Sequence, residues 1–297
     1  MQFFRDSNYE IVAKRKTGYI FSAILISVSI ISLIIHGGPK YNIDFTGGTL
    51  LHLKFDKSIQ VEDLRDQLAS LGYGDAEIKH FGANNEVSIR LGVTSEMDST
   101  TTIIKDKIAK ALPDNPFVEM RNESVGPKIG KELIFDALMA ILWAMVLILF
   151  YIMWRFEFKF SLGAIIALFH DIIITLGVFS ILEIEISAPI IAAVLTIVGY
   201  SLNDTIVVYD RIRENLKSIS KNVKDISPVV NSSINETLSR TVITSMTTLI
   251  VVVVLFFFGG EVLKTFALAL IIGVVIGTYS SIFVASPIVI DWRSKNA

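Results

Sequence analysis

The 297-residue sequence contains no cysteine and only four histidines, and these shortages exclude several kinds of chemistry. Without cysteine the chain can form no disulfide and can perform no thiol chemistry. His52 and His80 each stand alone in a predicted strand, so we interpret them as structural residues and predict no metal site. The sequence contains no nucleophile–base set and no GxxxxGK[ST] phosphate loop. We therefore predict that the chain is not an enzyme and binds neither ATP nor another cofactor.

An excess of charge of one sign is also lacking, because 27 Lys and Arg stand against 29 Asp and Glu, for a net charge of −2. A chain so close to neutrality gives no electrostatic reason to expect nucleic-acid binding. Hydrophobic residues make up 52% of the chain and the mean hydropathy is +0.58. Their distribution decides the class of protein, since they lie in long blocks while residues 37–131 have the composition of a soluble domain.

Six apolar blocks approach or exceed the length needed to cross a membrane as helices, because a bilayer core about 30 Å thick requires about 20 apolar residues. The first block follows the basic residues 14–16, as in a signal peptide, but it lacks a small-residue cleavage pattern. We predict that it is an uncleaved helix. The predicted spans are residues 18–36, 132–154, 161–182, 186–209, 240–258 and 265–290.

Lys and Arg gather in alternate short segments, which predicts the sidedness of the chain. The connections 183–189 and 259–264 contain one lysine between them. The basic residues are concentrated instead in the N-terminal segment 1–17, the connection after the second span, the loop 210–239 and the tail 291–297. We therefore expect both termini on the cytoplasmic side and residues 37–131 on the other side.

Residues 37–131 are predicted to form one small α+β domain. The expected elements are a strand at 49–56, a helix at 58–72 capped by Ser58, strands at 76–81 and 86–91 joined through 83–85, a helix at 97–112 and a strand at 117–121. This order of elements is the split βαβ, or ferredoxin-like, pattern. We interpret Gly47-Gly48 as a tight turn, and we expect the domain to contact another protein.

Ionisable residues inside the predicted spans suggest function, because they are costly in hydrocarbon. Asp204 follows Asn203 and lies five residues before Tyr209, roughly 8 Å from the cytoplasmic end of its span. Arg240 opens the next span from the same side, and its long side chain can reach toward the depth of Asp204. The sequence thus predicts an Asp204–Arg240 pair between neighbouring helices.

Two interpretations of this pair remain open. Burial favours the protonated form of a carboxyl and a nearby guanidinium favours the ionised form. If Arg240 approaches and retreats, Asp204 would alternately release and capture a proton. One charge crossing 100 mV supplies about 2.3 kcal/mol, enough to bias a repeated conformational cycle. The alternative is a static ion pair that joins two helices.

A second aspartate lies deeper in the predicted membrane region. Asp171 follows His170 and lies roughly 15 Å along the helix from Ser161, near the membrane centre. It is either a further proton site or a static structural residue, and His170 is either its partner or faces a neighbouring helix. Gly273 and Gly277 have the small-residue spacing that lets membrane helices approach closely, so we interpret them as packing residues.

Several segments together resemble the SecF family of bacterial protein-export proteins along nearly the full length of the chain. They are NIDFTGG at 42–48, SVGP at 124–127, FHD at 169–171, YSLNDTIVVYDRIREN at 200–215, NETLSRTVITSMTTL at 235–249 and GTYSSIFVASP at 277–287. The segment 200–215 is the most specific match. The chain departs from the family at Tyr209, where phenylalanine is common.

The resemblance implies an α-helical polytopic membrane protein with six transmembrane helices, like half of an RND-type transporter, and one extracytoplasmic domain. It also implies residence in the lipid of the cell's inner membrane and partnership with SecD, the SecYEG channel and a translocating preprotein. Proton flow powers a late, ATP-independent stage of export in this family, so protons would be the coupling ion. The family's intramembrane Asp and Arg fall on Asp204 and Arg240.

Two other functions are compatible with the residues themselves. An RND-like subunit that exports small molecules would share this architecture, although the single outer domain is small for a substrate path. A scaffold that only stabilises partner subunits would keep its buried charges as structural pairs. Co-purification with SecD and SecYEG would distinguish protein export from small-molecule export. Neutralising Asp204 and Arg240 would distinguish transport from scaffolding.

Overall fold

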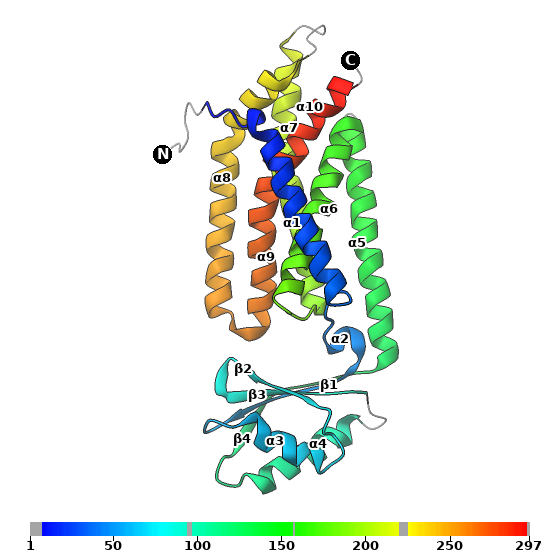
Figure 1. The fold of residues 1–297 in the computed structure, drawn as a ribbon, viewed down its shortest axis with the longest axis vertical. Helices are drawn as coiled ribbons and strands as arrows, with labels where there is room; N and C mark the ends of the chain where they lie inside the picture. The colour runs from blue at the N-terminus through cyan, green and yellow to red at the C-terminus, as the bar shows by residue number, and fades with distance from the viewer. Residues whose placement is uncertain (1–7, 94–96, 157, 220–224, 296–297) are drawn as a thin grey trace. The chain divides into compact units, whose positions relative to one another are not determined.

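The computed structural model describes residues 8–93, 97–156, 158–219 and 225–295, and the chain divides into two compact units (Figure 1). The first unit comprises Met1–Lys40 with Met139–Ala297, and the second comprises Tyr41–Leu138. Residues 1–7, 220–224 and 296–297 of the segments expected to be cytoplasmic lie outside the described residues.

Six helices in the described part of the chain are long and apolar enough to cross a membrane, which confirms the expected polytopic helical class. They are α1 (Arg15–Ile35), α5 (Pro127–Arg155), α6 (Phe158–Ile181), α7 (Ala188–Lys217), α8 (Ser227–Phe258) and α9 (Gly260–Ser280). A short 3₁₀ turn, η1 (Val12–Lys14), precedes α1. After α9 the chain continues through a π-helical segment, η2 (Ser281–Ala285), into α10 (Ser286–Lys295).

Much of the connection expected at 210–239 is helical. Helix α7 continues to Lys217 and α8 begins at Ser227 with Pro228 in its first turn, where the fixed φ of proline suits a helix start. At 1.5 Å per residue, a 30-residue helix such as α7 is about 45 Å long, which exceeds the thickness of a bilayer core. The hydropathy of the sequence therefore predicted where the apolar part of α7 and α8 lies, but it did not predict where these helices begin and end.

Helix α7 packs against α6, α8 and α9, and close contact with α9 depends on glycine. A side chain at Gly277 would place its Cβ 2.9 Å from Cβ of Ser201 on α7. A side chain at Gly273 would collide with Ile197 on the same helix. The predicted packing role of both glycines is confirmed.

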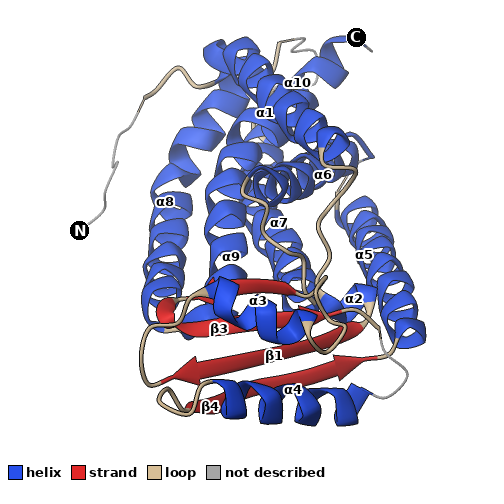
Figure 2. Cartoon of the chain, turned by 60° about the horizontal axis from the view of Figure 1, so that its bottom comes forward, coloured by secondary structure: helices blue, strands red, loops and turns tan. Residues whose placement is uncertain are grey.

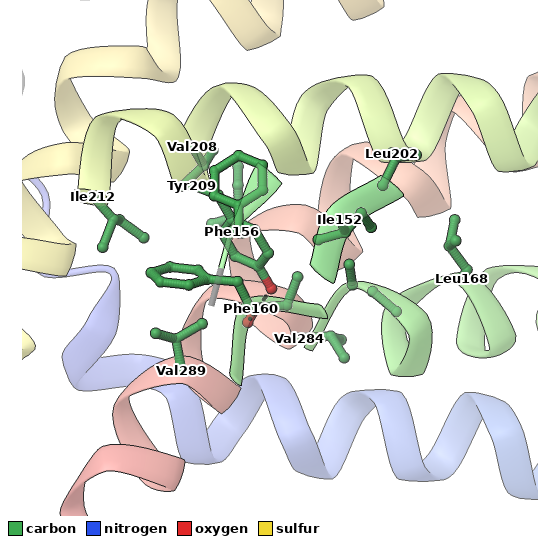
Figure 3. Close-up of a cluster of buried hydrophobic side chains, with 14 of the residues drawn as sticks. Ile152, Phe156, Phe160, Leu168, Leu202, Val208, Tyr209, Ile212, Val284 and Val289 are labelled. Atoms are coloured by element: carbon green, nitrogen blue, oxygen red, sulfur yellow. Dashed lines mark hydrogen bonds between the residues drawn. The ribbon is translucent and has the colours of Figure 1, made fainter. Parts of the chain in front are cut away.

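Aromatic and aliphatic side chains fill the core at one end of this unit, between α5, α6, α7 and the segment from η2 to α10 (Figure 3). Tyr209 is fully buried there, with its ring 4.9 Å from that of Phe160 between centroids. Its hydroxyl donates a hydrogen bond to the backbone oxygen of Ala285 at 3.0 Å. Tyr209 thus ties α7 to the π-helical segment, where the regular helical bonding pattern is altered.

The second unit contains a four-stranded antiparallel sheet with two helices on one face (Figure 2). In chain order its main elements are β1 (Gly48–Phe55), α3 (Val61–Ala69), β2 (Glu77–Phe81), β3 (Ala83–Leu91), α4 (Met97–Ala111) and β4 (Phe117–Val125). The strands lie in the order β2-β3-β1-β4. Alternate residues of β1, such as Leu51 and Leu53, are buried against apolar residues of the two helices, such as Leu64 and Ile108.

Two local predictions for this unit require correction, and a third is confirmed. Helix α3 follows Gln60 and has no side-chain cap, so the predicted cap at Ser58 is wrong. Strand β3 already begins at Ala83, because Gly82 alone, at φ +84°, makes the turn that was expected at 83–85. A short helix, α2 (Ile43–Thr46), precedes Gly47 and Gly48, whose positive φ angles confirm the tight turn.

Candidate functional site

Asp204 on α7 lies in a small polar cluster with α8 and α9. It is only 2% exposed. The hydroxyl of Ser245, on α8, lies 3.3 Å from Oδ2 of Asp204 and 2.7 Å from the hydroxyl of Thr278, on α9. The carboxyl is therefore removed from solvent and reaches both neighbouring helices through hydroxyl groups.

The hydrogen bonds offered to Asp204 are few, because the hydroxyl hydrogens nearby have other acceptors. Thr278 donates to the backbone oxygen of Val274 at 2.7 Å, so it accepts when Ser245 donates to it. Ser245 has a single hydrogen to divide between Thr278 and Asp204. An ionised carboxylate normally requires several donors when buried, and the described surroundings of Asp204 provide them sparsely.

Arg240 lies on α8, five residues before Ser245 and thus about 7.5 Å along the helix axis. Its side chain is exposed, and its backbone oxygen accepts a hydrogen bond from Thr244 at 2.9 Å. Asn203, next to Asp204, is also exposed. Within the described chain no ion pair of 4 Å or less joins Arg240 to Asp204, so the predicted pair stays a prediction.

Asp171 on α6 has a different environment, rich in donors. It is 1% exposed, and its Oδ1 lies 2.9 Å from Nδ1 of His170. Its Oδ2 accepts hydrogen bonds from Ser201 at 2.6 Å and from Ser280 at 2.9 Å. The interpretation of His170 as the partner of Asp171 is confirmed, and the two serines bring α7 and α9 into the same cluster.

The two aspartates are not brought together, although both clusters border the contact between α7 and α9. Ser201 lies three residues before Asp204, and Ser280 lies two residues after Thr278. Sequence reasoning missed Ser201, Thr278 and Ser280. Their only signal was a recurrence of hydroxyl residues within the apolar blocks.

In the second unit, His52 lies on β1, with Nε2 3.4 Å from Oε2 of Glu86 and its ring 4.5 Å from that of Phe81 between centroids. Burial lowers the pKa of His52, and the neighbouring Glu86 opposes this effect only in part. The described residues contain no group of three or more His, Asp and Glu side chains arranged to hold a metal ion. His52 is therefore a packed residue of the sheet.

The sequence and the fold of this chain both match known proteins. The model of the C-terminal region of the protein export membrane proteins SecD and SecF matches residues 104–295. The protein translocase subunit SecF of Calditerrivibrio nitroreducens is 46% identical over 286 residues, covering 96% of this chain and 94% of that protein. The subunit of the same name from Rhodothermus marinus is 46% identical over 100% of this chain and 97% of its own length.

Solved structures agree with the sequence matches. The crystal structure of SecDF, a translocon-associated membrane protein from Thermus thermophilus, matches all of this chain with a TM-score of 0.88 and 39% identity. A structure of SecDF in a super-membrane-facing form matches with a TM-score of 0.72 and 38% identity. This chain spans 40% of the length of each of those two chains. On these matches, the chain belongs to the SecD/SecF family of protein export membrane proteins.

Proposed function

We propose that this chain is a SecF-type subunit that uses the proton motive force to promote preprotein translocation through the SecYEG channel. The observation that carries the proposal is the buried carboxyl of Asp204, sparsely supplied with donors, on the helix beside the one that bears the exposed Arg240. A buried carboxyl with few donors binds a proton readily, and an approaching guanidinium would favour its release. Asn203, exposed beside Asp204, would border the proton path.

The relatives support the cargo. Two relatives that match over more than nine-tenths of their length are named protein translocase subunits, which favours a protein over a small molecule as the cargo. The solved SecDF chains are longer than this one, which supports association with a SecD partner. An exposed guanidinium at the start of a span also calls for a polar neighbour, and a path at the interface with SecD would provide one.

The outer unit supports the same proposal. We propose that this unit is a ferredoxin-like domain, which its β-α-β-β-α-β element order and its antiparallel strand order β2-β3-β1-β4 support. We assign the chain to the inner membrane of the cell, with both termini cytoplasmic and this domain on the opposite side, where it would contact the emerging preprotein. The chain would act without an enzymatic step or a bound cofactor, with protons as the coupling ion.

The test is translocation driven by a proton gradient in proteoliposomes that contain SecYEG, SecD and this chain. Asp204→Asn is expected to abolish the gradient-driven part of translocation and to leave the ATP-driven part intact. Glu214→Gln, the same kind of change at an exposed site further along α7, is the matched control and should behave as the wild type. Unchanged gradient-driven translocation in Asp204→Asn would refute the proton site.

A double-mutant cycle tests the partner. Asp204→Asn combined with Arg240→Gln should lose no more activity than the more severe single variant, because both act on one step. Full additivity of the two losses would refute the pair. A chain that acts only as a scaffold would tolerate both neutralising changes, whereas deletion of the whole chain would still stop export.

A further inference from the structure

The buried pair of His170 and Asp171 joins four helices through hydrogen bonds. Ser201 and Ser280 bind Oδ2 of Asp171 from α7 and α9, as described above. The other ring nitrogen of His170, Nε2, lies 3.0 Å from the hydroxyl of Ser22 on α1. Both His170 and Asp171 are almost completely enclosed within the chain's own helices.

The hydrogen bonds continue from Ser22 along α1 and fix the direction of donation. The hydroxyl of Tyr279, on α9, lies 2.7 Å from the backbone oxygen of Gly18, which can only accept, so Tyr279 donates there. The same hydroxyl lies 3.0 Å from that of Ser22. Since the hydrogen of Tyr279 is already used, Ser22 must donate to Tyr279. Ser22 then has no hydrogen left for His170.

The direction of these bonds determines the proton content of the pair. Ser22 can only accept from His170, so Nε2 carries a hydrogen. The 2.9 Å contact between Nδ1 and Oδ1 of Asp171 then requires one more proton, held on either atom. The pair is neutral overall in both cases, as burial demands. We propose that His170 and Asp171 share one proton in this conformation, and that loss of a proton from the pair breaks the contact between Ser22 and Tyr279.

When the pair releases the Nε2 proton to water, Nδ1 keeps the hydrogen that it shares with Asp171, the pair carries one negative charge, and Nε2 becomes an acceptor. Ser22 must then turn its hydrogen from Tyr279 to Nε2. The hydrogen bond between Ser22 and Tyr279 is lost, so that only the bond from Tyr279 to the backbone oxygen of Gly18 joins these groups of α1 and α9. Helix α1 is the helix that leads directly along the chain into the second unit.

The side chains that contact His170 and Asp171 from the other helices carry no charge. The helices packed against the pair contribute Ser22, Ser201, Tyr279 and Ser280, all neutral. The carboxyl of Asp204, on α7, contacts Ser245 of α8. On α1 the ionisable groups Arg15 and Tyr19 contact Asp291 on α10. In the described chain His170 is the only ion-pair partner of Asp171.

The proton count can be measured without any transport assay. The full chain with its SecD partner in lipid nanodiscs would carry ¹⁵N-labelled histidine, and His170→Gln would identify the His170 signals among those of four histidines. We expect Nε2 of His170 to be protonated at neutral pH. A neutral ring protonated only at Nδ1 would overturn the proposal.

A tyrosine variant tests the link to Ser22. Tyr279→Phe removes the bond that holds the hydrogen of Ser22 away from Nε2, so the deprotonated pair should form about tenfold more readily, as measured from the ¹⁵N signals of His170 across pH. Tyr209→Phe removes another hydroxyl that donates to a buried backbone oxygen but has no contact with the pair, so it is the matched control. Equal titrations in the two variants would overturn the link.

The role of this link in transport rests on the proposed function, and a second readout separates the two. Tyr279→Phe should change the pH dependence of gradient-driven translocation, and Tyr209→Phe should not. If both tyrosine variants keep the wild-type pH dependence while Asp204→Asn is inactive, the link plays no part in transport and only that part of the proposal fails. If Asp204→Asn is active, the proposed function fails and the proton count of the pair stands on the spectra alone.

Discussion

Tyr209 and Gly163 offer a test of how closely the helices pack where α6, α7 and η2 meet. The hydroxyl of Tyr209 donates to the oxygen of Ala285. A Cβ added at Gly163, on α6, would lie 2.5 Å from that hydroxyl and 2.9 Å from the same backbone oxygen. The glycine and the hydroxyl therefore depend on one another, and each can be removed separately.

The expected magnitudes follow from these contacts. Tyr209→Phe keeps the ring packed against Phe160 but leaves a buried carbonyl without its donor, which should cost about 1–3 kcal/mol of unfolding free energy. Gly163→Ala should cost about 1–3 kcal/mol through overpacking, partly offset by the better helix propensity of alanine, worth about 1 kcal/mol. In the double variant the hydroxyl that collides with the new methyl group is gone. The loss should be smaller than the sum by about 1 kcal/mol or more.

The measurement is equilibrium unfolding of the purified chain in detergent for the wild type, both single variants and the double variant. Leu64→Ala, in the core of the other unit, combined with Tyr209→Phe gives the control for additivity, because the two residues share no contact. Full additivity of Gly163→Ala and Tyr209→Phe, or no loss of stability in Tyr209→Phe alone, would refute the described packing.

Three further predictions concern the pH dependence of stability, the packing of α9 against α7, and the hydrophobic core of the second unit. Burial lowers the pKa of His52, so the unfolded chain binds the proton more readily than the folded chain. The second unit should therefore lose stability as pH falls below about 6.5. His52→Gln should remove this pH dependence of stability, measured by hydrogen exchange of the sheet amides. Gly277→Val should cost about 1–3 kcal/mol of unfolding free energy by forcing α9 away from Ser201, whereas Gly199→Val, with no atom within 4 Å of the added Cβ, should cost less than 1 kcal/mol. Leu64→Ala should destabilise the second unit by about 2–5 kcal/mol in thermal unfolding, because Leu64 is fully buried between α3 and the sheet.

The hydropathy and element patterns predicted much of the architecture because they depend on residue type alone. The six spans and the strand and helix order of the second unit came from runs and periods of apolar residues. The ends of α7 and α8 did not, since the charged residues from Asp210 to Lys217 continue a helix beyond the apolar stretch that hydropathy detects. The cap at Ser58 failed because the chain enters α3 only after an extended Gln60.

The site was predicted less completely, and the reason is geometric. Depth along a helix follows from counting residues, so the levels of Asp204 and Arg240 could be estimated from the sequence. The partners of a buried side chain depend also on how each helix is rotated about its axis. Ser245 and Thr278 meet Asp204 because α8 and α9 turn those residues toward α7, and no local pattern encodes that rotation.

The two buried aspartates have the same residue type and similar burial, and their donors separate their roles. Asp171 accepts hydrogen bonds from Ser201 and Ser280 and contacts His170, although the single hydrogen of Ser280 is also within reach of the backbone oxygen of Gly277. Asp204 faces Ser245 and Thr278, whose hydrogens both have other acceptors, and Arg240 on α8 is exposed. A carboxyl that exchanges protons with a path needs a partner that can come and go, which suits Asp204. A proton held by a closed set of donors can change only when a helix contact changes, which suits Asp171 as the group that links protonation to α1.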